Sequence, residues 1–294
     1  MKVLRGFVTS ILALLLFALL FVFGAVFTLD RTVLNADFVT SEINKLDMPA
    51  LAGELVSPQI PAEYRFAADE INGIIAELQP WIKEQISTIV HTGYDYLLDR
   101  SDSMKVVIPL EPAKEKIKTK LREAFLKSPP AEYRGMSPAM LEQTFNQFYQ
   151  DFSQSVTSTF EIDESMIPQE FGSIVQEIRH YAGYYQVTYW GLVAIIIIFM
   201  LLIFALNGEV RGTARSLGIT FILYGAIVFA LVWAMEKYGA PYLKFAELPQ
   251  ALQSWILQVS HDSLGPIQIF NIGLLAAGIV LLVISFVYPK PVED

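Results

Sequence analysis

The chain has 294 residues, of which 53% are apolar and 17% are charged, and its formal net charge is −9. Soluble domains carry roughly 25% charged residues, so this composition indicates a membrane protein. The sequence contains no cysteine, which excludes disulfides, thiolate nucleophiles and cysteine-based metal sites. Its acidic balance gives no electrostatic basis for binding nucleic acid.

Four apolar stretches without Asp, Glu, Lys, Arg or His predict four transmembrane helices. They are residues 7–29, 187–206, 216–235 and 267–288. Each is long enough to cross a hydrocarbon core of roughly 30 Å, which takes about 20 helical residues. The fold class that follows is an all-α membrane protein with four transmembrane helices. A mainly helical extracytoplasmic domain, for which we allow a small β element, is inserted between spans 1 and 2.

The first segment, residues 1–29, begins with Lys2 and Arg5 and continues as an uncharged run of 23 residues. This run exceeds the roughly 7–15 residues of a signal-peptide core. Phe23 disturbs the small-residue pattern at the candidate cleavage site near Gly24 and Ala25. We therefore favour an uncleaved signal anchor that forms span 1; the alternative is a cleaved leader and a three-span protein.

Cations are concentrated in the short segments on one side of the predicted membrane. Residues 1–6, 207–215 and 289–294 carry five Lys or Arg in 21 residues, whereas residues 236–266 carry two in 31. The side richer in cations is the cytoplasmic one. We expect a multi-pass protein of the plasma (inner) membrane with both termini, including the tail 289–294, in the cytoplasm. Residues 30–186 and the loop 236–266 then lie outside.

Residues 30–186 form the predicted extracytoplasmic domain, which carries 24 acidic and 14 basic residues. Apolar residues at helical spacing predict helices at 62–100, at 112–127, from Ser137 as N-cap towards Phe160, and from Pro168 to Leu206. Pro80 predicts a kink or a break into two helices. The predicted core includes Ile75, Ile86, Leu121, Phe145, Phe148 and Phe152.

Two further elements are predicted around these helices. The β-branched segment 104–109 predicts a strand, and residues 160–163 are its suggested partner. In the outer loop 236–266, apolar residues at helical spacing predict an amphipathic helix that contains Leu248, Trp255 and Val259. We expect this helix to dock on the large domain, to lie in the outer membrane interface, or to do both.

The candidates for chemistry are few, and we predict no catalytic residue, no cofactor and no metal site. His91, His180 and His261 lack metal-ligand spacing, and we interpret them as surface or helix-end residues. His261, Asp262 and Ser263 bring triad residue types together, but sequence neighbours seldom have triad geometry. The basic run of residues 114–122 is interpreted as a solvated helix face; attraction to an anionic polymer or headgroup is the alternative.

Polar and small residues within the spans indicate how the helices contact one another and a partner. Asn271 is expected to hydrogen-bond across helices, with a pore-lining role as the alternative. Small residues at four-residue spacing in spans 3 and 4 predict close helix approach, through which the chain forms a homo-oligomer or binds a protein partner in the bilayer. These residues are Ala226, Ala230, Ala234, Gly273 and Ala277.

Three function classes are consistent with this pattern. We favour a non-enzymatic membrane protein whose extracytoplasmic domain binds a partner or ligand, in envelope assembly or sensing. The alternative is a channel or transporter subunit whose pore forms by oligomerisation, although the spans lack the ionisable groups typical of such pathways. An extracytoplasmic enzyme is least favoured because no catalytic motif is present.

Overall fold

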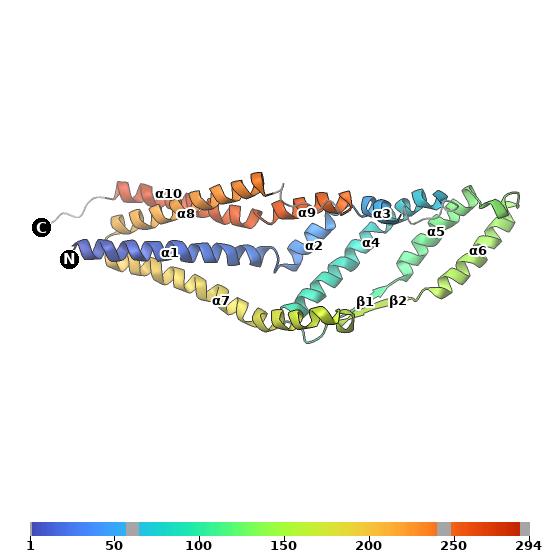
Figure 1. The fold of residues 1–294 in the computed structure, drawn as a ribbon, viewed down its shortest axis with the longest axis horizontal. Helices are drawn as coiled ribbons and strands as arrows, with labels where there is room; N and C mark the ends of the chain where they lie inside the picture. Colours follow the sequence, from blue (N-terminus) through green and yellow to red (C-terminus); the bar gives the residue numbers. More distant parts are fainter. Residues whose placement is uncertain (1, 57–64, 240–247, 289–294) are drawn as a thin grey trace. The chain divides into compact units, whose positions relative to one another are not determined.

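The computed structural model describes residues 2–56, 65–239 and 248–288. The structure is 83% helical, and the described residues include four helices that are long and apolar enough to cross a membrane. Figure 1 labels the elements and colours them along the chain, from blue at the N-terminus to red at the C-terminus. These helices confirm the helical class and indicate a multi-pass membrane protein.

The chain divides into two compact units. The first, called here the span unit, comprises Met1–Phe38, His180–Lys244 and Leu257–Asp294. The second, the helical unit, comprises Val39–Arg179 and Phe245–Ile256. Each unit therefore combines segments that are far apart in the sequence.

The predicted spans lie in four long helices. These are α1 (Lys2–Arg31), α7 (Gln169–Asn207), α8 (Val210–Tyr238) and α10 (Gly265–Val287). Helix α7 is 39 residues long and continues through Gly183, as its lack of turn signals predicts. Fully buried side chains of the span unit include Leu16 of α1, Ile203 of α7 and Tyr224 of α8.

Helices α8 and α10 lie side by side and pack closely (Figure 1). A Cβ atom at Gly218 or at Gly278 would lie 3.0 Å from the carbonyl oxygen of the other glycine. Glycine thus allows the two backbones to approach, which is how helices commonly associate in a bilayer. The predicted small residues Ala226, Ala230 and Gly273 are exposed instead, so other positions make the contact within the chain.

The helical unit is built from helices and one strand pair. Its elements are α2 (Ala36–Asn44), α3 (Met48–Val56), α4 (Arg65–Leu97), β1 (Lys105–Pro109), α5 (Glu111–Lys127), α6 (Pro138–Ser155), β2 (Thr159–Asp163) and the start of α7, with two short 3-10 turns, Ala131–Tyr133 and Glu164–Met166. Helix α4 runs through Pro80 as one element, so the break into two helices does not occur.

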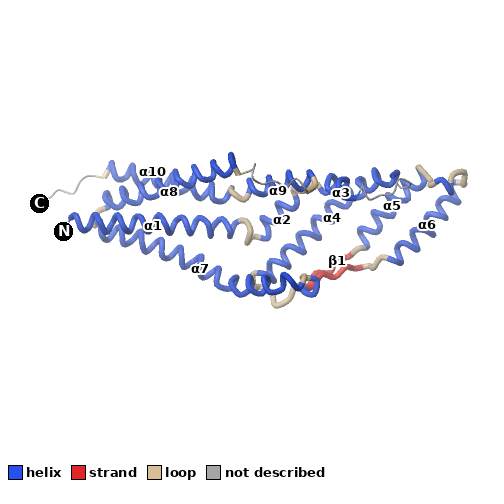
Figure 2. Tube along the Cα trace, in the orientation of Figure 1, coloured by secondary structure: helices blue, strands red, loops and turns tan. Residues whose placement is uncertain are grey.

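The predicted strand pairing is confirmed. Strand β1 pairs antiparallel with β2, in a register that sets Val106 opposite Ile162 and Ile108 opposite Phe160. Val106 and Ile108 are buried, as the alternation of side chains along a strand requires when one face is covered. Figure 2 shows this short strand pair in red among the helices.

Helix α6 starts as predicted, and its predicted core residue Phe145 is buried while Phe148 is not. The Ser137 hydroxyl accepts a hydrogen bond from the backbone N–H of Met140, which caps the helix. Leu141, Phe145 and Tyr149 are buried, whereas Phe148 is 58% exposed. The prediction of Phe148 as a core residue was therefore wrong, because residues at spacing i, i+4 and i+8 fill the core instead of the neighbouring row.

Helix α9 (Gln250–Asp262) docks its first half on the helical unit. The Glu54 carboxylate accepts hydrogen bonds from the backbone N–H groups of Gln250 at 2.6 Å and Ala251 at 3.3 Å. The Trp255 indole N–H donates to the carbonyl oxygen of Glu42 at 2.6 Å. The two bonds to Glu54 satisfy free N–H groups at the helix start, and all three contacts agree with the docking alternative for this segment.

Candidate functional site

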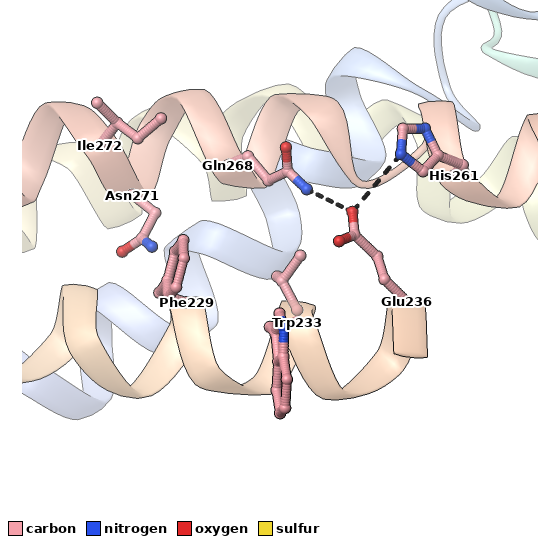
Figure 3. A pocket seen from close by; sticks show the side chains of 8 residues that line it. Phe229, Trp233, Glu236, His261, Gln268, Asn271 and Ile272 are labelled. Atoms are coloured by element: carbon pink, nitrogen blue, oxygen red, sulfur yellow. Dashed lines mark hydrogen bonds and ion pairs between the residues drawn. The ribbon is translucent and has the colours of Figure 1, made fainter. Parts of the chain in front are cut away.

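A pocket of about 350 Å³ lies in the span unit where α8 ends and α10 begins (Figure 3). Helix α8 supplies Glu236 from its last turn, and α10 supplies Gln268 from its first turn. His261, near the end of α9, completes the polar rim. Three helix ends therefore bring polar side chains together at the end of the spans.

The Glu236 carboxylate is the centre of the polar contacts. Its Oε1 accepts a hydrogen bond from Gln268 Nε2 at 2.7 Å and lies 3.7 Å from His261 Nε2. The side chain of Glu236 is 32% exposed. Figure 3 shows its second oxygen pointing away from His261, and no hydrogen bond or ion pair joins that oxygen to any described residue.

Apolar side chains form the rest of the pocket. Trp233 and Phe229 lie about one and two turns before Glu236 on α8, with Val232 on the same helix and Ile272 on α10. Asn271 lies among them and is 2% exposed. The pocket thus joins an anionic edge to an aromatic and aliphatic interior.

The hydrogen bonding of the Asn271 amide oxygen differs from that predicted. Its Oδ1 is buried and has no hydrogen-bond partner among the described residues, so the expected bond across helices is not made by this oxygen. A Cβ at Gly225 would lie 3.1 Å from the same oxygen. Gly225 therefore provides the space into which the amide packs.

Lys237, which follows Glu236 in the chain, is held on aromatic rings. Lys237 places its ammonium 4.8 Å from the ring centre of Trp233 and 5.5 Å from that of Tyr238. Such cation–π contacts are worth about 0.5–1 kcal/mol at exposed sites. Lys237 forms no ion pair with Glu236, so the carboxylate is not neutralised by its sequence neighbour.

The three histidines have separate environments. His91 Nδ1 lies 2.8 Å from the Ser87 carbonyl oxygen on α4, and the ring of His180 packs against Tyr181 and Tyr184 on α7. Within the described residues, no group of three or more His, Asp or Glu side chains is arranged to hold a metal ion.

The His261-Asp262-Ser263 sequence does not form a triad. His261 Nδ1 lies 3.4 Å from Asp262 Oδ1, but the Ser263 hydroxyl donates to the Val259 carbonyl oxygen at 2.7 Å. The serine is thus directed to its own helix and away from a role as nucleophile.

The basic run on α5 packs the helical unit together. Lys114 is only 7% exposed and donates to the Val156 carbonyl oxygen at 2.7 Å. Lys120 pairs with Glu77 of α4 at 2.8 Å. The interpretation of the whole run as a solvated face was therefore wrong, because these lysines join α5 to its neighbours.

Arg122 makes the same kind of link to α6. Its guanidinium donates two hydrogen bonds to Glu142, at 2.6 and 2.8 Å. This bidentate bonding holds the pKa of the Glu142 carboxyl below its ordinary value.

An exposed apolar row lies on the first part of α7. Phe171, Ile174 and Ile178 are 53%, 50% and 43% exposed, and their spacing places them along one helix face. Glu170 and Glu177 are exposed beside them. We call these three apolar residues the α7 row.

Arg179 fixes the end of this row. Its guanidinium donates to the carbonyl oxygen of Tyr96 at 2.6 Å and to Asp99 Oδ1 at 2.9 Å. It also lies 4.1 Å from the ring centre of Tyr96. Since its side chain is only 13% exposed, this contact anchors α7 to the end of α4 while the apolar row stays open.

Comparison of the chain with protein-family models, curated proteins and solved structures found no match. The functional interpretation of the pocket and of the α7 row therefore rests on their geometry alone. Of the residues that line the pocket, the sequence singled out Asn271 and His261 but not Glu236 and Gln268. The available signal was a carboxylate immediately after a predicted span, at a helix end that the helix dipole makes unfavourable for an anion.

Proposed function

We propose that this protein is a non-enzymatic, multi-pass protein of the plasma (inner) membrane that acts in envelope assembly or sensing. Its helical unit binds a protein partner outside the cytoplasm. The observation that supports this proposal is the α7 row, with three large apolar side chains each more than two-fifths exposed. Contiguous apolar residues on a surface are typical of interaction sites.

The spacing of the row favours a helical partner. Anchors at i, i+3 and i+7 are the pattern by which one amphipathic helix packs on another. Exposed Glu170 and Glu177 both lie along one side of the row, and they favour Lys or Arg beside the apolar face of the partner. The proposed partner is therefore an amphipathic helix whose apolar face is bordered by cations.

The alternative, a channel or transporter subunit, has less support. Thr220, Tyr224 and Asn271 are polar groups within the spans, yet they are 5%, 1% and 2% exposed. Side chains packed in this way do not line an open path. A pore would have to form between copies of the chain, for which the exposed small residues Ala226, Ala230 and Gly273 supply a contact face. Ion flux through liposomes that contain the purified protein tests this alternative directly.

Site-specific photo-cross-linking in cells tests the partner proposal. A photoreactive phenylalanine at Ile174 should cross-link to another protein, and the cross-linked peptide should be an amphipathic helix with Lys or Arg at its edges. The control position is Gln176, which is also exposed on α7 but lies about 200° around the helix from Ile174.

Reversing the charges of Glu170 and Glu177 tests whether the cross-link at Ile174 reports a specific contact or non-specific association. Glu170→Lys together with Glu177→Lys should reduce cross-linking at Ile174 several-fold, because like charges then face the partner. Equal cross-linking at positions 174 and 176, or a cross-link only to a second copy of this chain, would overturn the proposal of a separate helical partner.

A further inference from the structure

We propose that the pocket between α8 and α10 binds a phospholipid that carries a primary ammonium group, with the ammonium on Glu236. This site is independent of the proposed partner contact, which uses the helical unit. The ligand class follows from charge, hydrogen-bonding capacity, shape and position.

The end of α8 carries two negative charges close together. The last turn of a helix carries unpaired carbonyl groups equivalent to roughly half a negative charge, which disfavours an anion and attracts a cation. Glu236 adds a full carboxylate two residues before the helix ends at Tyr238. A charge of the same sign as the helix end beside it is locally unfavourable, and such exceptions are typical of functional positions.

The two carboxylate oxygens of Glu236 differ in their hydrogen bonds. Oε1 is used by Gln268 at 2.7 Å, which orients the carboxylate. The second oxygen has no partner among the described residues and points away from His261 (Figure 3). A primary ammonium donates up to three hydrogen bonds, and a charge-assisted bond to a carboxylate is about twice as strong as a neutral one.

The walls of the pocket fit the rest of an amphiphile. Phe229 offers an aromatic ring that attracts a cation, and Val232 and Ile272 offer apolar contact for methylene groups. The volume of about 350 Å³ is at the lower end for small-molecule sites, which suits a headgroup and the first part of a chain.

Position and neighbouring charge favour a zwitterionic lipid as the source of the ammonium. Glu236 follows immediately after the predicted span 216–235, where lipid headgroups lie. Lys237 comes next, so an anion and a cation are adjacent in the chain. This order of charges complements a headgroup in which an ammonium is linked to a phosphate.

Native mass spectrometry of the full-length protein in detergent tests the proposal. The probes are three dioleoyl phospholipids with the same phosphate and chains, whose headgroups end in ethanolamine, choline or glycerol. The ethanolamine lipid should be retained at least tenfold better than the other two. Choline has no N–H to donate to Glu236, and glycerol has no positive charge.

Substitutions of Glu236 identify the group responsible. Glu236→Gln keeps an acceptor for Gln268 but removes the charge, and it should abolish the preference for ethanolamine. Glu236→Asp keeps the charge and should retain a preference. The matched control is Glu209→Gln, which makes the same change at the exposed opposite end of α8 and should leave retention unchanged.

The source of the amine is distinguished in a competition experiment. Dodecylammonium, which lacks a phosphate, should displace the ethanolamine lipid only at much higher concentration. Displacement at equal concentration would show that the site takes any long-chain amine. That result would overturn the assignment to a phospholipid. Equal retention of all three lipids, or unchanged selectivity in Glu236→Gln, would overturn the site itself.

Discussion

Tyr149 shows how a single side chain can hold two helices in register. Its ring stacks on that of Phe145, with centroids 6.0 Å apart and planes 22° apart. Its hydroxyl donates to the Lys114 carbonyl oxygen on α5 at 2.7 Å. Burial raises the pKa of this phenol, with a further contribution from Glu115 and Glu111. The residue combines apolar contact with one directed bond between α5 and α6.

Two phenylalanines three residues apart are expected to behave differently. Phe145 is 1% exposed, so Phe145→Ala should cost about 3–5 kcal/mol and lower the midpoint of thermal unfolding by on the order of 10 °C. Phe148 is 58% exposed, so Phe148→Ala should change stability by about 0.5 kcal/mol or less. Circular dichroism of the full-length protein in nanodiscs measures both, and equal losses for the two variants would contradict this account of α6.

Periodicity alone could not separate these two residues. Positions 145 and 148 lie about 60° apart around a helix, so both fit a broad apolar stripe. The choice depends on Tyr149, whose ring is buried because its hydroxyl finds a backbone acceptor on another helix. Lys114 was missed for a similar reason, since the carbonyl oxygens that receive its ammonium come from a distant part of the chain.

Among the elements, local signals were the most reliable. Ser137 with Pro138 marked the start of α6, and the β-branched residues of 105–109 marked β1. The pocket was not predictable in this way. It requires α8 and α10 to approach through Gly218 and Gly278, so that Glu236 meets Gln268, and this pairing of helices is not encoded in any one segment.

Helix α7 is expected to have no hinge at Gly183. It is continuous from Gln169 to Asn207, although glycine within a helix costs roughly 1 kcal/mol relative to alanine. We expect backbone amides of residues 178–188 to be protected from hydrogen exchange about as well as those of 171–177. Exchange measured by mass spectrometry in nanodiscs tests this, with Gly183→Ala as the control. Fast exchange confined to Gly183 and suppressed in that variant would indicate a hinge.

At the scale of the whole molecule, charge asymmetry and helix count lead to the same topology. The described residues contain four candidate spans, and four crossings predict that both chain ends lie on one side. The cation-rich segments 1–6, 207–215 and 289–294 all fall on that side, and cations close to spans favour the cytoplasm. The helical unit, formed mainly by residues between spans 1 and 2, is then predicted to lie outside.

Two single cysteines in this cysteine-free chain test the topology. Ser103 lies between α4 and β1, and Glu209 lies between α7 and α8; both are exposed. A membrane-impermeant maleimide should label Ser103→Cys on intact cells but Glu209→Cys only after the membrane is permeabilised. Glu209 is a better site than Asn207, whose amide nitrogen is buried. Labelling of Glu209→Cys but not Ser103→Cys on intact cells would invert the topology, and would place the α7 row in the cytoplasm together with any partner that it binds.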